Sequence, residues 1–137
     1  MSYPTTQPAD LIAARLDAQT SLELGADLFI GTERPPVAPI PSAAVFVAAY
    51  GGTSSPDMGV SSDDRYFSVQ VMVRGAPDGY AAAETVATDC LTALDRWLPN
   101  SDGYVECKVQ SAGPVNAGLA DQAQPRFTLN VKLTYHG

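Results

Sequence analysis

The sequence is poor in the side chains that carry most enzyme chemistry. Its 137 residues include one histidine, His136, which is the penultimate residue, and two cysteines, Cys90 and Cys107. A general base needs a rigid position beside a nucleophile, and chain ends fray, so His136 is expected to be an exposed tail residue. The cysteines lack the spacing of a metal site and are expected to be buried free thiols. We therefore expect no enzyme, no catalytic residue, no cofactor and no bound metal.

The sequence also lacks a long apolar run and an excess of basic charge. No stretch approaches the length needed to cross a bilayer, and the opening residues MSYPTTQPAD carry no secretion signal. We expect no contact with a membrane and a chain that is cytosolic when it is made. Fifteen acidic residues against 8 basic ones give a formal charge of −7, and the basic residues are scattered singly, without a patch. Because nucleic-acid affinity comes largely from Lys and Arg, tight binding to DNA or RNA is not expected.

Two segments have the three-to-four-residue periodicity of amphipathic helices. Residues 8–20 begin with a proline, where the missing N–H costs nothing, and carry an apolar stripe. A longer stripe begins after Pro77 and continues through Trp97 and Leu98, which predicts the main helix of the chain, ended by Pro99 and Asn100.

Five segments have the patterns of strands. The brief apolar run 28–30 and the run 43–50, apolar enough to be covered on both faces, come first. The segments 67–74, 103–112 and 126–136 then alternate apolar and polar residues. The order of elements predicts an α+β fold in one domain over residues 1–137. We expect a mixed, mostly antiparallel sheet with the N-terminal helix and the long helix packed on one face.

Two polar segments are expected to be long flexible loops. Residues 51–64 and 113–125 are rich in Gly, Ser, Asp, Asn and Gln and have little apolar content to bury. Loops of this length without structure of their own are often functional or mobile.

The charged residues near these loops favour contacts over chemistry. The turn RGAPDGY after the strand 67–74 has two separated glycines, a proline and no lysine, which does not suit a phosphate site. Asp63 and Asp64 are adjacent, and neighbours in an extended chain point in opposite directions, so they are not expected to form a carboxylate pair. We expect Asp63, Asp64, Arg65, Arg74 and Arg126 to take part in contacts with other subunits or partners.

Four segments of the chain resemble a known family. They are LFIGTERPPVAP, AVFVAAYGG, RYFSVQVMVRG and RFTLNVKLTY, with a Tyr- and Ala-rich helix and a Gly-Pro loop between them. Together they resemble the minor capsid or tail terminator (tail completion) proteins of long-tailed bacteriophages. The likeness extends from the first helix to Tyr135, and YGG at 50–52, VQVMVRG at 69–75 and RFTLNV at 126–131 are its most telling pieces.

The resemblance implies a structural virion protein. Related terminators form a ring, a hexamer in known cases, at the head-proximal end of the tail tube, where the ring stops tube polymerisation and offers a surface for head–tail joining. The implied partners are other copies of the chain, the tail tube protein and a neck or head-completion protein. Genome DNA would pass through the ring without specific binding. The implied location is the head–tail interface of the virion, and the host cytoplasm during assembly.

Two alternatives remain open on the sequence. A head–tail connector or neck protein on the portal side would share the ring and differ only in its place. A small ligand-binding or enzymatic domain would instead need a pocket between the long helix and the sheet. Thr88 and Tyr80 are the candidates for a polar group in such a pocket.

Overall fold

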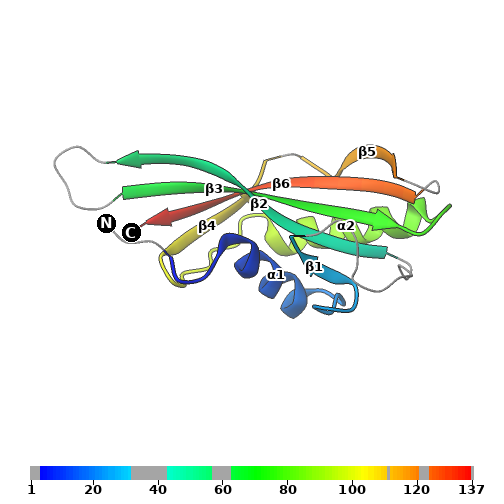
Figure 1. The fold of residues 1–137 in the computed structure, drawn as a ribbon, viewed down its shortest axis with the longest axis horizontal. Coiled ribbons are helices and arrows are strands. Elements are labelled where there is room, and N and C mark those ends of the chain that lie inside the picture. Colours follow the sequence, from blue (N-terminus) through cyan, green and yellow to red (C-terminus); the bar gives the residue numbers. More distant parts are fainter. Residues whose placement is uncertain (1–3, 32–42, 57–62, 111, 121–123, 137) are drawn as a thin grey trace.

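The computed structural model describes residues 4–31, 43–56, 63–110, 112–120 and 124–136 of the chain. Within these residues the chain forms two helices and six strands (Figure 1). In sequence order they are α1 (Pro8–Gln19), β1 (Leu28–Ile30), β2 (Ala43–Pro56), β3 (Asp63–Gly75), α2 (Tyr80–Leu94), β4 (Tyr104–Val109), β5 (Val115–Ala120) and β6 (Gln124–His136).

The six strands form one sheet. Its order is β1-β2-β3-β6-β4, and β5 also pairs with β6. Since β3 occupies one edge of β6 along most of its length, β4 and β5 share the other edge, β4 beside its end and β5 beside its beginning. The pair β1–β2 is parallel and the other pairs are antiparallel. This confirms the expected α+β fold with a mixed, mostly antiparallel sheet.

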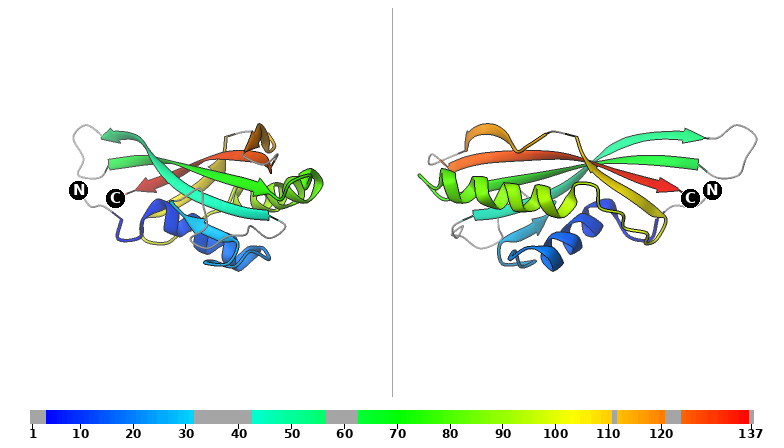
Figure 2. Two further views of the ribbon diagram at one scale, coloured as in Figure 1. Left: turned by 45° about the vertical axis from the view of Figure 1, so that its right-hand side comes forward. Right: turned by 180° about the vertical axis from the view of Figure 1, so that it is seen from behind.

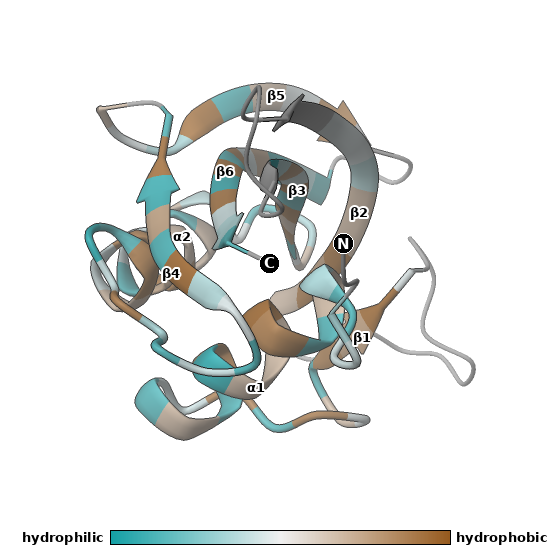
Figure 3. Cartoon of the chain, turned by 90° about the vertical axis from the view of Figure 1, so that its left-hand side faces the viewer, coloured by the Kyte–Doolittle hydropathy of each residue, from teal (hydrophilic) through white to brown (hydrophobic). Residues whose placement is uncertain are grey.

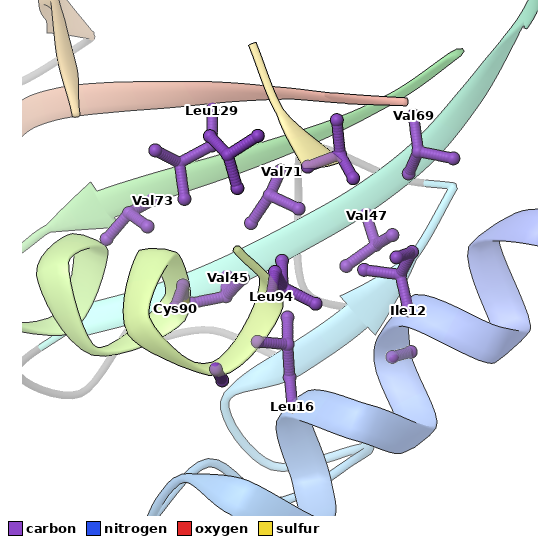
Figure 4. Close-up of a cluster of buried hydrophobic side chains, with 14 of the residues drawn as sticks. Ile12, Leu16, Val45, Val47, Val69, Val71, Val73, Cys90, Leu94 and Leu129 are labelled. Atoms are coloured by element: carbon purple, nitrogen blue, oxygen red, sulfur yellow. The ribbon is translucent and has the colours of Figure 1, made fainter. Parts of the chain in front are cut away.

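Both helices cover the same face of the sheet, as expected (Figure 2). α2 lies against β3 and β6, and α1 lies against β1, β2 and α2. The strands face the helices with every second residue, which Figure 3 shows as alternating brown and teal bands along β4 and β6. The core between the layers is apolar, and its fully buried side chains include Ile12, Leu16, Val45, Val47, Val69, Val71, Val73, Cys90, Leu94 and Leu129 (Figure 4). Burying one such aliphatic side chain stabilises the fold by about 1.5–3 kcal/mol, which makes this layer the main source of stability.

The long helix ends earlier than its apolar stripe predicts. α2 stops at Leu94, and Arg96 takes a left-handed backbone conformation with φ +60°. The chain then turns so that the Cys107 N–H donates to the Trp97 carbonyl oxygen at 2.7 Å, and Leu98 is exposed. Pairing with the edge of β4 therefore replaces the last helical turn, which helix periodicity alone cannot show.

The loop predicted at 51–64 is wrong over much of its length. β2 continues to Pro56 and β3 begins at Asp63, with a register that runs from Gly52 opposite Phe67 to Pro56 opposite Asp63. Residues 57–62 lie outside the described residues. Backbone ladder bonds do not need apolar side chains, so a Gly- and Ser-rich segment can continue a strand where its partner is already in place.

The same correction applies to the loop predicted at 113–125. β5 occupies Val115–Ala120 and pairs with the beginning of β6, which starts at Gln124. Residues 121–123 lie outside the described residues.

One extra residue in β2 produces a bulge. The register shifts between Ala49 and Gly52, opposite Val69 and Phe67 of β3. Beyond this bulge the ends of β2 and β3, residues 52–56 and 63–67, extend past both helices (Figure 1). We refer to them as the hairpin arm. A bulge bends and twists a strand, so it sets the direction in which the arm leaves the rest of the sheet.

Candidate interaction surface

The face of the sheet opposite the helices carries no further layer within the described part of the chain (Figure 2). Its side chains alternate with the buried ones, and most of them are polar. We refer to it as the open face, and define it by Tyr66, Ser68, Gln70, Met72 and Arg74 of β3, Arg126, Thr128, Asn130, Lys132 and Thr134 of β6, and Glu106 and Lys108 of β4. At its β1 end it continues into a small apolar cluster of Phe29, Ala44 and Phe46.

Strand pairing places basic side chains directly opposite each other on the open face. Arg74 lies opposite Arg126, and Lys108 lies opposite Lys132. The two pairs are six residues apart along β6, which corresponds to roughly 20 Å. Four of the chain's 8 basic residues therefore share one face. The expectation that the basic residues are scattered singly is wrong for these four, because the register that pairs them is not visible in the sequence.

Aromatic rings and a carbonyl hold three of these cations. The Arg74 guanidinium lies 5.7 Å from the centre of the Phe46 ring, and the Lys132 ammonium lies 4.3 Å from that of Tyr66. Arg126 donates from Nη2 to the Ala117 carbonyl oxygen at 3.2 Å. These contacts position the cations without neutralising their charge.

The helical layer carries the opposite charge. Residues 4–27 and 78–102 comprise α1, α2 and their flanking turns, and contain nine acidic side chains against two basic ones. The acidic ones are Asp10, Asp17, Glu23, Asp27, Asp78, Glu84, Asp89, Asp95 and Asp102, and the basic ones are Arg15 and Arg96. Arg15 is engaged between the helices, since its Nε donates to the Ala93 carbonyl oxygen at 3.0 Å and its guanidinium lies 4.9 Å from the Trp97 ring centre. The two sides of one subunit thus differ in the sign of their charge.

The structure brings together two of the five predicted contact residues. Arg74 and Arg126 are cross-strand neighbours. Arg65 lies nine residues before Arg74, roughly 30 Å away along β3, and faces the side of the helices. Asp63 and Asp64 begin β3 opposite Pro56 and Ser55, and their side chains lie outside the described part. A contact role for all five stays a prediction, and Lys108 and Lys132 join them as residues that sequence reasoning missed.

A hollow lies where the hairpin arm meets the start of α1. Its volume is about 330 Å³, and its lining consists of Gln7, Pro8, Ala49, Gly51, Gly52, Arg65, Tyr66 and Phe67. Arg65 is the single charged group among these lining residues. His136 is exposed at the end of β6, and its N–H donates to the Gly103 carbonyl oxygen at 2.8 Å, so its backbone is held in the sheet and is not a frayed tail.

Asp102 ties the segment before α1 to the turn before β4. Its Oδ2 accepts a hydrogen bond from the Thr6 N–H at 2.6 Å and from the Thr5 hydroxyl at 2.8 Å. These bonds, the one from the Thr6 backbone first, hold the pKa of the Asp102 carboxyl below its usual value. The Tyr104 hydroxyl also donates to the Thr6 carbonyl oxygen at 2.7 Å.

We expect the change Asp102→Asn to loosen this attachment without unfolding the protein. A neutral amide accepts more weakly than a carboxylate, so the Thr6 amide should exchange with solvent roughly 3- to 10-fold faster. Hydrogen exchange followed by NMR measures this. In the unmodified protein, Asp102 should protect the Thr6 amide fully above the pKa of an unfolded Asp, near 3.9. This protection should disappear as the pH falls through the lower pKa of Asp102 in the folded protein. Asp78→Asn is the control, because Asp78 and Asp102 both have a positive φ. If the Thr6 amide exchanged equally fast in the two variants, Asp102 would not be the group that protects it.

The two cysteines are buried free thiols, as expected. Burial raises the pKa of Cys90 and of Cys107 to about 12. At neutral pH both are therefore protonated, and the thiolate is the form that reacts. We expect an aromatic disulfide reagent to modify neither thiol in the folded protein and both in denaturant. Rapid modification of the folded protein, measured by absorbance, would show that one of these side chains is accessible.

Neither helix in the described part of the chain is long and apolar enough to span a bilayer. Among the described residues, no group of three or more His, Cys, Asp and Glu side chains is placed to hold a metal ion. Comparison with models of known protein families gives no match, and comparison with curated proteins gives none either.

Proposed function

We propose that the chain is a structural virion protein that forms a ring at the head-proximal end of a phage tail tube. The ring ends tube polymerisation and offers the surface to which the head is joined. Its partners are other copies of the chain, the tail tube protein and a neck or head-completion protein. Genome DNA passes through the ring without specific binding. The starting point is the resemblance of the four sequence segments to tail terminators.

The observation that carries the proposal is that the subunit has an apolar buried core and two different surfaces through which it can contact other subunits. The core between helices and sheet is apolar, the open face presents mostly polar side chains, and the helical layer carries an excess of acidic ones. A subunit of a closed ring must meet its two neighbours through two different surfaces. The open face and the helical layer are two such surfaces. The arm extends past the helices, which leaves it accessible to a further partner in the proposed assembly.

The helix–sheet pocket of the enzymatic or ligand-binding alternative has little support. Thr88 is exposed on α2, where its hydroxyl donates to the Glu84 carbonyl oxygen of the preceding turn at 2.9 Å. Tyr80 is 47% exposed and sets its ring 5.1 Å from that of Phe127. Neither side chain enters the apolar layer as a polar anchor. Ligand pockets need a few such groups to orient what they bind.

Electron microscopy of tail tubes tests the proposed function. Tubes assembled from the tail tube protein encoded alongside this chain should end in an added ring at one end and stop growing when the purified chain is present. Tubes without the chain should continue to grow. Tubes that grow unchanged and have bare ends would contradict the proposal. Rings on portal-bearing heads but not on tubes would replace it with the connector alternative.

A further inference from the structure

The charges of one subunit are separated between its two sides. The described side chains of the open face include four basic ones and one acidic one. The basic ones are Arg74, Arg126, Lys108 and Lys132, and the acidic one is Glu106. The helical layer, on the other side of the sheet, has an excess of seven acidic side chains over its residues 4–27 and 78–102. The outward side of α2 contributes Glu84 and Asp89, both exposed.

We propose that the open face binds the helical layer of a second copy of this chain. The contact is head-to-tail: the basic sheet face of one subunit meets the acidic helices of the next. This inference rests on the proposed ring and adds which surfaces form the contact between its subunits. A head-to-tail contact repeats from subunit to subunit, and closes into a ring when the rotation at each step allows it.

The alignment of basic side chains is the first argument. Lys108 lies opposite Lys132, and like charges directly opposite in a sheet are destabilising. Carboxylates brought over the open face would relieve this repulsion. Arginine in particular presents a planar set of donors that matches a carboxylate.

The overall charge is the second argument, because it selects the occupant. A nucleic acid also carries negative charge, but it would approach a chain whose formal charge is −7. Long-range repulsion then opposes binding of a polyanion. A second copy of the chain has a basic open face as well as an acidic helical layer. Each contact between two copies can therefore join the open face of one to the helical layer of the other.

Charge reversal on each surface tests the contact. The sheet variant carries Lys108→Glu and Lys132→Glu, and the helix variant carries Glu84→Lys and Asp89→Lys. All four side chains lie outside the apolar core. In the sheet variant the open face becomes net acidic like the helical layer, and in the helix variant the outward side of α2 becomes basic like the open face. Self-association of each variant alone should therefore weaken by about tenfold or more. Sedimentation velocity over a range of concentrations measures this, and thermal melting followed by circular dichroism confirms that both variants fold.

Mixing the two variants is the decisive arm of the experiment. The acidic open face of the sheet variant can bind the outward side of α2 that the helix variant makes basic, and the basic open face of the helix variant can bind the acidic helical layer of the sheet variant. An equimolar mixture should therefore assemble again, with the two variants alternating. The neutral variant with Lys108→Gln and Lys132→Gln is the matched control, and should weaken association less than the sheet variant. Assembly of the unmodified chain should also weaken between about 0.05 M and about 0.5 M salt, because the contact is electrostatic.

Three results would overturn the inference. The first is a chain that stays monomeric at all concentrations and salt conditions, and the second is assembly of either variant at the strength of the unmodified chain. The third is binding of duplex DNA by the open face without self-association. None of these depends on the growth of tail tubes, which tests the proposed function separately. Bare tube ends together with restored assembly on mixing would leave the contact in place and remove only the proposed role.

Discussion

The change Gly52→Ala should lower the free energy of unfolding by about 2–5 kcal/mol, combining backbone strain with a steric clash. Gly52 lies at the bulge of β2 with a φ of +142°, a backbone conformation that residues other than glycine rarely adopt. A Cβ added there would lie 1.8 Å from the carbonyl oxygen of Tyr66, which belongs to the backbone of β3. Because the obstacle is backbone, relief requires the two strands to separate. Denaturant unfolding followed by circular dichroism measures the effect.

Gly51→Ala is the matched control for this prediction. Gly51 also has a positive φ, +99°, but a Cβ there would meet no atom within 4 Å. It should therefore show only the cost of a left-handed conformation, about 1–2 kcal/mol. Equal losses at both positions would mean that the close approach of β2 to β3 does not constrain the bulge. The hairpin arm beyond Gly52 should then be free to adjust, and its direction would not be fixed by this residue.

The elements with strong side-chain periodicity were predictable from the sequence. The segment 126–136 alternates strictly, and the structure confirms it as β6, with Phe127, Leu129 and Val131 buried. α1 begins at the proline that marks its first turn. In both elements one face is buried, and the periodicity records this burial. For such segments local pattern and tertiary environment agree.

The hairpin arm and β5 were not predictable, because their residues record no buried face. Residues 51–56 read GGTSSP, a composition typical of turns, yet they form a strand because β3 is already in place beside them. β5 similarly pairs with the beginning of β6 although Val115 and Leu119 are exposed. What fixes these segments is backbone pairing with a distant partner, and no local propensity reports it.

The candidate surface was half predictable for a related reason. The polar positions of the strands were visible, and Arg74 and Arg126 were expected to make contacts. Their alignment depends on the register between β3 and β6, and that of Lys108 with Lys132 on the register between β4 and β6. A slip of one residue would move each set to the other face. The charge of the open face is therefore a property of the pairing, and it becomes visible only in the folded chain.

The change Leu129→Ala should cost about 2–5 kcal/mol of unfolding free energy, the range for large-to-small changes in a packed core. Leu129 is fully buried at the centre of β6, between β3 and the helices (Figure 4). Truncation removes apolar contacts and leaves a cavity that rigid strands on either side cannot close. Denaturant unfolding measures the loss, and the slope of the transition should stay unchanged if the folded state keeps its compactness.

Leu119→Ala makes the same chemical change at a position that is 65% exposed on β5. It buries little and should shift the free energy of unfolding by no more than about 0.5 kcal/mol. Because neither residue belongs to the open face, both variants should keep the self-association of the unmodified chain while folded. A large loss of stability with Leu119→Ala would show that β5 is covered in solution, and self-association that disappears with it would extend the contact surface to this edge of the sheet.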